Sequence, residues 1–373
     1  MNLIVAIVIA VCVYLWQKKL YASWWNKNLD VTISFADTCI REGDESTLTE
    51  TIYNGKLLPL PVFHVKFSTA RALEFADREN ASVTDGYYRN DIFSVLGYRK
   101  IMRRLLFCAK KRGLYGILTL HITARDFFMT TNFASSKKCD TWLYVLPSRI
   151  RVPAFDIYCR KLVGEVWTRQ NLIEDPYEFR GIREYTYGDT MRRINWKKTA
   201  HVSSLMVNQY GYTSEQRIKI LLNLETNIMV KTDYMQELCI RMAGTAADVF
   251  LHEHISVDLA SNGVDVLTGQ CECVEAGMSL AHGETIDKYL ARISENAGID
   301  RFLSILDTVL LHREQNVMYL IISPYYKEDL LRKLDYMQQM GASVHMIVPY
   351  YDIQDTENWR PYMQGMEVKW NET

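Results

Sequence analysis

The segment from Glu178 to His201 combines guanidinium, carboxylate and aromatic side chains at a density found nowhere else in the sequence. Its cations are Arg180, Arg183, Arg192, Arg193, Lys197 and Lys198, its acids are Glu178, Glu184 and Asp189, and its aromatic residues are Phe179, Tyr185, Tyr187 and Trp196. The Gly188-Asp189 pair predicts a turn, with Asp189 capping a short helix from Thr190 onward. On that helix Arg192 and Trp196 are four residues apart, which predicts a cation–π contact.

Two interpretations of this segment remain open. In the first, which is favoured, the arginines pair with the carboxylates and stack on the aromatic rings, so that the segment is clamped onto a neighbouring folded unit. In the second, some arginines are free and present a surface for an anion or a protein partner.

Motifs of known enzyme classes are sparse. The sequence has no GxxxxGK phosphate loop, no GxGxxG after a strand and no GxSxG elbow. His252-Glu253-His254 lacks the HExxH spacing of zinc hydrolases, and a polar surface cluster of Asp248, His252 and His254 is favoured over a catalytic one. We therefore expect the protein not to be an enzyme. A cell-envelope hydrolase that uses the acids and histidines of residues 248–258 is the alternative.

Composition narrows the class of protein further. Apolar residues make up 48% and charged residues 23% of 373 residues, which is ordinary for globular domains and long enough for two of them. The net charge of -1 argues against nucleic-acid binding. Eight cysteines without a CxxC pair predict neither a zinc site nor a disulfide framework, and mostly reduced, buried thiols fit a cytosolic setting.

The first 25 residues predict a membrane anchor. Leu3 to Trp16 is an uninterrupted apolar run, about 21 Å long as a helix, and interfacial aromatic residues follow it. Lys18 and Lys19 come directly after the run, so the positive-inside rule predicts a single-pass protein of the cell membrane with the bulk of the chain in the cytoplasm. A signal peptide and a buried N-terminal helix are the alternatives.

The rest of the chain divides by its apolar pattern. Residues 26–140 alternate apolar and polar side chains between polar turns, which predicts an antiparallel β-sandwich with a hairpin turn at Asn54-Gly55. Residues 216–373 carry apolar strands without alternation between amphipathic helices, which predicts an α/β domain with a mainly parallel sheet. Residues 141–215 are expected to hold linker strands and the Arg-rich segment.

The Arg-rich segment also carries a family resemblance. The order R-x-Y-x-x-G-D-x-x-R-x-I-N-W stands here as Arg183, Tyr185, Gly188, Asp189, Arg192, Ile194, Asn195 and Trp196. It resembles the signature of the domain-of-unknown-function 58 (DUF 58) family. Lys111 to Tyr115 is similar to the family's RGxY run, and Asp126-Phe127-Phe128 stands where DPFGL is usual.

The resemblance implies a membrane-bound protein with a von Willebrand factor A-like, Rossmann-like domain, often associated with MoxR-type AAA+ ATPases. In such domains a D-x-S-x-S motif after the first strand binds Mg²⁺. Here Asn223, Glu225 and Asn227 stand at its three ligand positions, and Ser323 follows a later strand. Two amides and one longer carboxylate make a weak site for a hard cation, so we expect no bound metal.

The sequence as a whole thus predicts an α+β multidomain protein that consists of a transmembrane helix, a β-sandwich and an α/β domain. Its expected function is that of a scaffold that docks a protein partner, a MoxR-like ATPase by resemblance, in the assembly or maturation of other proteins. Docking residues are expected from the loops that hold Asn223, Glu225, Asn227 and Ser323. A module that binds polyanions or lipid surfaces through the Arg-rich segment is a third alternative.

Overall fold

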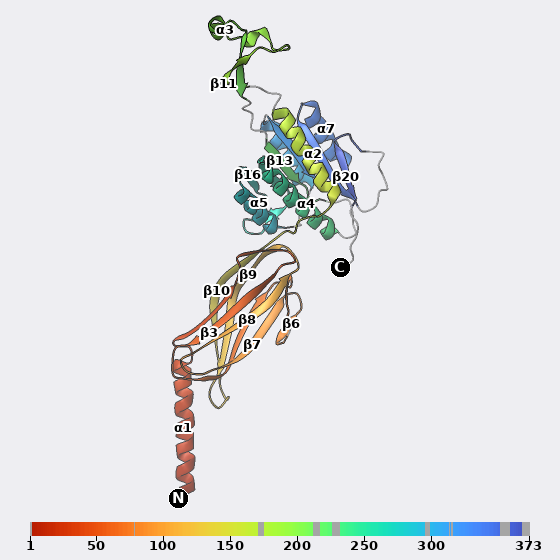
Figure 1. The fold of residues 1–373 in the computed structure, drawn as a ribbon. Coiled ribbons are helices and arrows are strands. Elements are labelled where there is room, and N and C mark those ends of the chain that lie inside the picture. Colours follow the sequence, from red (N-terminus) through yellow and green to blue (C-terminus); the bar gives the residue numbers. More distant parts are fainter. Residues whose placement is uncertain are drawn as a thin grey trace. The chain divides into compact units, whose positions relative to one another are not determined.

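The structure is a computed structural model, and it describes residues 2–77, 79–170, 175–211, 217–225, 232–294, 299–312, 314, 316–350 and 359–367. The chain forms two compact units, Met1–Ser148 and Arg149–Thr373. It is a mixed α and β protein with an N-terminal apolar helix and several sheets (Figure 1).

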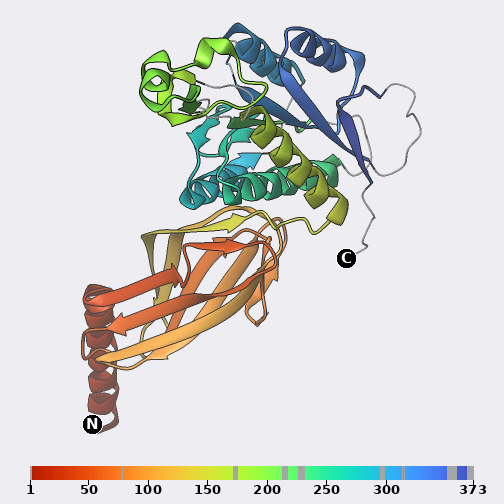
Figure 2. The same ribbon diagram turned by 45° about the horizontal axis from the view of Figure 1, so that its top comes forward.

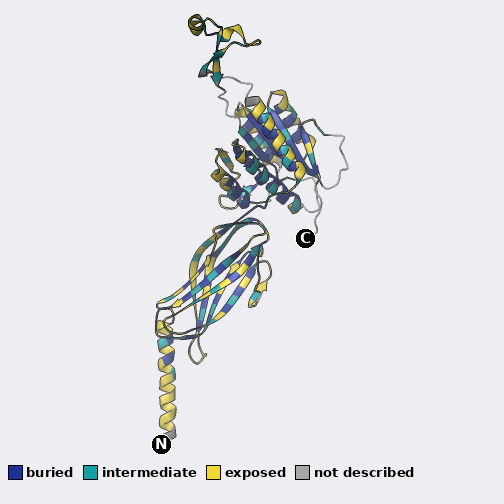
Figure 3. Cartoon of the chain, viewed as in Figure 1, coloured by how far each residue is buried: buried dark blue, intermediate teal, exposed yellow. Residues whose placement is uncertain are grey.

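The chain begins with helix α1, Asn2–Trp24. Its stretch Ile4–Trp24 is long and apolar enough to cross a membrane, with a mean hydropathy of 1.6. Figure 3 shows most of the helix exposed, including all the described residues of its N-terminal half. Its last turns differ, since Gln17 and Tyr21 are buried against the rest of the first unit. Trp25, which comes directly after the helix, is also buried there.

The rest of the first unit is a largely antiparallel β-sandwich. One sheet has the order β1-β3-β8-β5, and the other has the order β2-β10-β9-β4-β7-β6, in which β2 pairs parallel with β10. The strands are β1 Leu29–Phe35, β2 Cys39–Arg41, β3 Glu45–Asn54, β4 Leu60–Thr69, β5 Leu73–Phe75, β6 Ala81–Val83, β7 Tyr87–Val95, β8 Arg99–Ala109, β9 Gly113–Arg125 and β10 Asn132–Leu146. Alternate side chains such as Val31, Ile33, Leu48 and Ile52 fill the core between the sheets, as the two-residue period predicts.

Two sequence predictions in this region are wrong. Asn54-Gly55 does not close a hairpin, because β3 and β4 belong to different sheets and the segment between them crosses from one to the other. The unit also ends at Ser148 and not near residue 140. The apolar run Trp142–Leu146 is the end of β10, whose pairing with β9 continues to Val145.

The second unit is built on a sheet of order β16-β14-β13-β18-β19-β20, parallel except for β16. Its strands are β13 Arg217–Leu222, β14 Ser256–Ser261, β16 Cys273–Gly277, β18 Val317–Ile322, β19 Ser343–Tyr350 and β20 Met363–Glu367, and a small ladder joins β15 Val264–Asp265 to β17 Ile293–Ser294. The chain moves outward from β13 through β14 to β16 and then returns to place β18 on the other side of β13. The strand order therefore reverses between β13 and β18.

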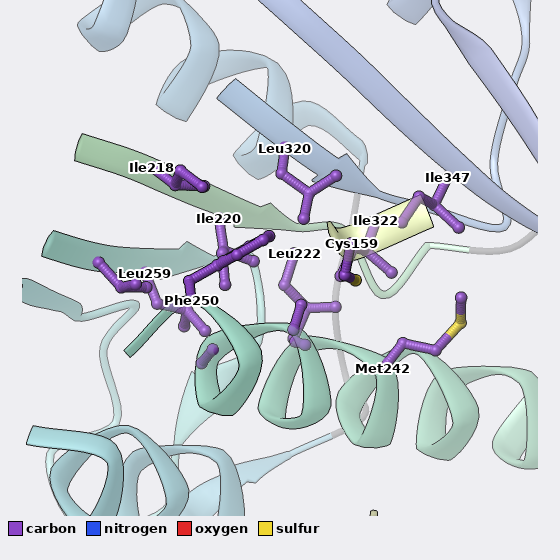
Figure 4. Packing of buried hydrophobic residues seen from close by; sticks show 14 of the residues in the cluster. Cys159, Ile218, Ile220, Leu222, Met242, Phe250, Leu259, Leu320, Ile322 and Ile347 are labelled. Carbon is purple, nitrogen blue, oxygen red and sulfur yellow. The ribbon is translucent and has the colours of Figure 1, made fainter. Parts of the chain in front are cut away.

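Helices cover both faces of this sheet (Figure 2). One face packs against α2 Pro153–Gln170, α4 Thr232–His252 and α5 Leu280–Arg292, and the other against α6 Ile299–His312 and α7 Glu328–Gln339. Figure 4 shows Cys159 and Phe250 against the side chains of Ile220 and Leu222 in the first of these cores. Ile218, Ile220 and Leu222 of β13 face one core and Leu221 faces the other, which explains the apolar run from Ile220 to Leu222.

Helix α2 corrects another prediction, because residues 153–170 are not linker strands. Its buried residues Phe155, Cys159, Leu162 and Val166 recur at helical spacing on one face. The remaining elements are strands β11 Asp175–Glu184 and β12 Met206–Gly211, the 3₁₀ helix η1 Met191–Arg193 and helix α3 Trp196–Val202. We call Asp175–Gly211 the hairpin module. The cysteines form no disulfide. Cys159 and Cys239 are buried, whereas Cys12, Cys271 and Cys273 are exposed. The prediction that most of the thiols are buried is therefore wrong.

Candidate functional site

A buried polar network lies at the carboxyl edge of the α/β sheet, where the strand order reverses. Asn223 follows β13 and is fully buried, and its Nδ2 donates to Oγ of Ser323, which follows β18, over 3.0 Å. Asn262, which follows β14, donates from Nδ2 to Oδ1 of Asn223 over 2.8 Å. Asn223 and Ser323, which we expected in loops after strands, therefore bond to each other at this edge, and Asn262 is a further partner that we did not expect.

Each member of this network finds its hydrogen bonds within the protein. Oδ1 of Asn223 also accepts from the backbone N–H of Glu225 over 3.1 Å, and Oδ1 of Asn262 accepts from the N–H of Leu224 over 2.9 Å. The Ser323 hydroxyl donates to the carbonyl of Tyr325 over 2.8 Å and accepts from its N–H over 3.1 Å. Because buried amides and hydroxyls are costly only when unpaired, the network is stable without any added charge.

The network holds charged residues at the rim of this edge. Glu225 is half-buried, and burial raises the pKa of its carboxyl group while Lys327 opposes that shift. Lys327 is exposed, and its ammonium lies 5.5 Å from the ring of Tyr325. Tyr325 donates to Asp329 over 2.6 Å. Asn227, the third expected position, lies outside the described residues.

The donor set at this edge determines what it can bind. A hard divalent cation needs several oxygen ligands that include carboxylates. Here the oxygen atoms of Asn223 and Asn262 already accept N–H groups, and Glu225 is the nearest acid that the network positions. Within the part of the chain that the structure describes, no three His, Cys, Asp or Glu side chains gather as a metal-binding group.

The hairpin module holds the Arg-rich segment in a fold of its own. Arg183 makes a bidentate pair with Asp189, with Nη1 to Oδ2 at 2.8 Å and Nη2 to Oδ1 at 2.6 Å. Asp189 also accepts from the N–H of Thr186 over 2.8 Å. These donors, led by Arg183, hold the pKa of the Asp189 carboxyl well below its usual range. Gly188 supplies the positive φ of +115° that the turn between them requires.

Two predictions about this segment are wrong. Asp189 does not cap a helix, because its carboxylate is bound to Arg183 and the N-cap residue of η1 is Thr190, without a side-chain bond. The helix that does have a side-chain cap is α3, where Oδ1 of Asn195 accepts from the N–H of Lys198 over 2.9 Å. Trp196 opens α3 and Arg192 belongs to η1, so the two do not share one helix.

The hairpin module exposes large side chains. Trp196 is 64% exposed, and Phe179, Tyr187 and Met191 are also exposed. Arg192 is exposed beside them, whereas Tyr185 is half-buried and its N–H donates to the carbonyl of Leu205. The side chain of Arg180 lies outside the described residues. Whether the segment clamps the α/β unit stays a prediction, but the Arg183–Asp189 pair and the Asn195 cap organise the module itself.

The histidines of the hydrolase alternative lie at a surface, whereas its Asp258 is buried and paired with Lys219 over 3.1 Å. His252, Glu253 and His254 are exposed at the end of α4, and Asp248 is bound to Arg149. Arg149 also makes a bidentate pair with the buried Asp287, with both N–O distances at 2.7 Å. The acid is thus engaged in a structural ion pair.

A cavity of about 320 Å³ lies between α2 and strands β19 and β20. His345 Nε2 lies 3.2 Å from Glu165 and 3.4 Å from the hydroxyl of Ser343, and Nδ1 lies 3.4 Å from the hydroxyl of Tyr158. A serine nucleophile needs the base and the orienting acid on different nitrogens of the histidine. Here Ser343 and Glu165 meet the same nitrogen, so the cluster is not arranged as a catalytic triad. No local motif predicts this cluster, because Glu165 and His345 are far apart in the chain.

Comparison with known proteins gives no family model and no curated protein that matches the chain. Solved structures with partial similarity include a cohesin from Archaeoglobus fulgidus (16% identity, 31% of this chain and 91% of that one, TM-score 0.22). They also include a CARDB domain with two bound metal ions from Pyrococcus furiosus (12%, 31% and 94%, TM-score 0.20) and a type I cohesin–dockerin complex from Clostridium thermocellum (9%, 32% and 100%, TM-score 0.23). At these values the similarity carries no inference about activity or partners.

Proposed function

We propose that the protein is a membrane-anchored scaffold whose von Willebrand factor A-like domain docks a protein partner without a metal ion. The observation that carries the proposal is the Asn223–Asn262–Ser323 network at the point where the strand order reverses. In open α/β sheets this is where ligands bind. A buried set of neutral groups at that place supports a surface for recognition, with Glu225 and Lys327 at its rim.

The anchor and the hairpin module support the same function. Helix α1 has the length and composition of a single membrane span, and Lys18 and Lys19 favour a cytoplasmic location for the units that follow. The exposed Trp196 and Arg192 have the residue types that dominate the energetics of protein interfaces. On the DUF 58 resemblance, the partner is a MoxR-type AAA+ ATPase and the process is the assembly or maturation of other proteins.

The test uses photo-crosslinking amino acids in the full-length protein in its native membranes. We expect probes at Glu225 and at Trp196 to form adducts with an AAA+ ATPase, and a probe at the exposed Gln338 on α7 to form none. Equal capture from all three positions would contradict the proposal. Calorimetric titration with Mg²⁺ tests the metal-free mode, and a dissociation constant on the order of micromolar would overturn that part.

A further inference from the structure

The end of the β-sandwich at which α1 enters gathers three connecting segments, residues 55–59, 96–98 and 126–131. Their neighbourhood follows from the strand register, since Leu60 pairs with Val95 and Asn132 pairs with Arg125. Helix α1 joins them there, because Tyr21 donates to the carbonyl of Pro59 over 2.8 Å. We call this end of the sandwich the anchor end.

The docking of α1 fixes where a membrane surface would meet it. Gln17 Nε2 donates to Asp126 over 2.9 Å, Tyr21 is buried, and the Trp25 ring stacks on Phe133 at 6.0 Å. The exposed apolar part of α1 is therefore Ile4–Trp16, about 20 Å of helix against a hydrocarbon core of roughly 30 Å. The anchor end must then lie at the membrane surface.

The segment 126–131 is a rigid turn beside this exposed part of the helix. The buried carboxylate of Asp126 accepts from Gln17, from the Thr130 hydroxyl over 2.8 Å and from the Thr131 N–H over 2.9 Å. Met129 adopts a positive φ of +59°, and its N–H donates to the carbonyl of Asp126 over 2.9 Å. The turn is thus tied to α1 by the same carboxylate that closes it.

This rigid turn presents its largest apolar side chains outward. Phe127, Phe128 and Met129 are 61%, 51% and 55% exposed. The ring of Phe128 lies 6.1 Å from that of Tyr14 on α1, which places it level with the exposed apolar part of the helix. Leu57 and Leu96 are also exposed on the neighbouring segments. A contiguous group of this kind marks a surface that is covered by a partner or by lipid.

The charges at the anchor end distinguish these partners. The anchor end and the adjoining part of α1 carry exposed bases, namely Lys18, Lys19, Lys27, Arg99, Lys100 and Arg125. The acid in its turns, Asp126, is buried, and the exposed Asp30 at the start of β1 is paired with Lys137 over 2.6 Å. The opposite end has no such excess of bases, since its acids Asp37, Asp44 and Glu45 lie among the exposed Arg71, Lys110 and Lys111. Bases around apolar tips match a bilayer surface that contains anionic lipids.

We propose that the anchor end is seated in the surface of an anionic bilayer, with Phe127, Phe128 and Met129 inserted beside α1. This inference rests on the membrane anchorage proposed above and adds a second membrane contact to it. Because Asp126 ties the turn to the helix, the sandwich has a fixed orientation on the membrane. The helix alone would be a flexible tether.

The test is lipid-phase photolabelling of the full-length protein in vesicles of phosphatidylcholine and phosphatidylglycerol, with the labelled residues located by mass spectrometry. We expect Phe127–Met129 to be labelled as strongly as Ile4–Leu15. Leu106 and Leu118 are equally exposed apolar residues on β8 and β9, and they should stay at background. The double variant Phe127→Ser/Phe128→Ser should lose labelling at Met129 and keep it in α1, whereas Leu106→Ser/Leu118→Ser should change neither.

The outcomes separate this inference from the proposed function. Labelling of α1 together with an unlabelled turn would overturn the inference and leave the anchor in place. An unlabelled α1 would overturn the anchor, and the inference with it. Label at Leu106 and Leu118 equal to that in the turn would also refute a defined seat on the membrane.

Discussion

Replacing Asn223 by Asp keeps the size of the side chain and exchanges one hydrogen-bond donor for a negative charge. The two bonds accepted at Oδ1, from Asn262 and from the N–H of Glu225, survive the change. The bond donated to Ser323 does not, because its hydroxyl proton is already given to the carbonyl of Tyr325. Either two oxygens then face each other, or the hydroxyl turns and leaves that carbonyl unpaired.

The expected cost follows from these contacts. Leaving one buried polar group unpaired costs about 1–3 kcal/mol, and an uncompensated buried charge brings the total to about 3–5 kcal/mol. The side chain is fully buried, so water cannot reduce this cost. For a unit of this size we expect the melting temperature of the α/β transition to fall by about 10 °C. Burial raises the pKa of the new carboxyl group above its unfolded value, so the deficit should be smaller at pH 5 than at pH 8.

Calorimetry of the full-length protein in detergent tests this prediction, because it resolves the transitions of the two units. Gln338→Glu adds the same charge at an exposed position and serves as the control. Excess Mg²⁺ should raise the melting temperature of Asn223→Asp and leave the unmodified protein unchanged. If Asn223→Asp melts like the control at pH 8 without Mg²⁺, the network does not have the role assigned to it.

Three further predictions concern other buried or capping groups. Burial and the neighbouring Asp91 raise the pKa of Glu50 to about 8. The stability that its protonated form contributes is therefore fully present below pH 4.5 and is lost as pH rises through 8. Glu50→Gln should remove this loss of about 4–5 kcal/mol, seen as a flat denaturant midpoint between pH 5 and 9. Lys56 is buried, its ammonium has no acceptor among the described residues, and burial lowers its pKa to about 8. Lys56→Met should therefore raise stability at pH 7 by about 2–3 kcal/mol, and the gain should disappear as pH rises from 8 to 10.5. An equal gain at every pH would show that the buried charge is not the cause. Asn195→Ala removes both the bond from the Lys198 N–H and the bond donated to Asn208, so it should cost about 1–2 kcal/mol in the hairpin module, measured by amide hydrogen exchange. Asn195→Asp should keep the first bond and lose the second, so protection of the Lys198 amide should fall less than in Asn195→Ala.

The local pattern of the sequence predicts much of this fold. Strands β18 and β19 form in the region 216–373, where apolar strands without alternation predicted a mainly parallel sheet. The apolar period also predicts the sandwich strands and α1. Helix α2 escaped prediction because charged residues separate its four core positions, although Pro153 at its first position was a readable start signal. The strand order and the sheet change after Asn54 depend on pairings between distant segments, which no local pattern encodes.

The candidate site shows the same division between local and distant information. Asn223 and Ser323 were readable because each follows an apolar strand. Asn262 also follows a strand, but an Asn-Gly pair at such a place is typical of an ordinary turn. Pairing it with Asn223 required knowing that β14 and β13 are neighbours. The cap at Asn195 was missed because Asp189 offered an earlier and more conventional start for the helix.

The physical logic of the network explains why an amide at position 223 matters. A carboxylate there would be buried, and a buried anion requires a cation or a full set of donors. An amide needs only one acceptor and one or two donors, and Ser323, Asn262 and the N–H of Glu225 provide them. The edge of the sheet can therefore be ordered at all times, independently of the supply of metal ions. On the proposed function, a docked partner contacts Glu225 and Lys327 at the rim, so reversing the charge at either position should change binding without changing the fold.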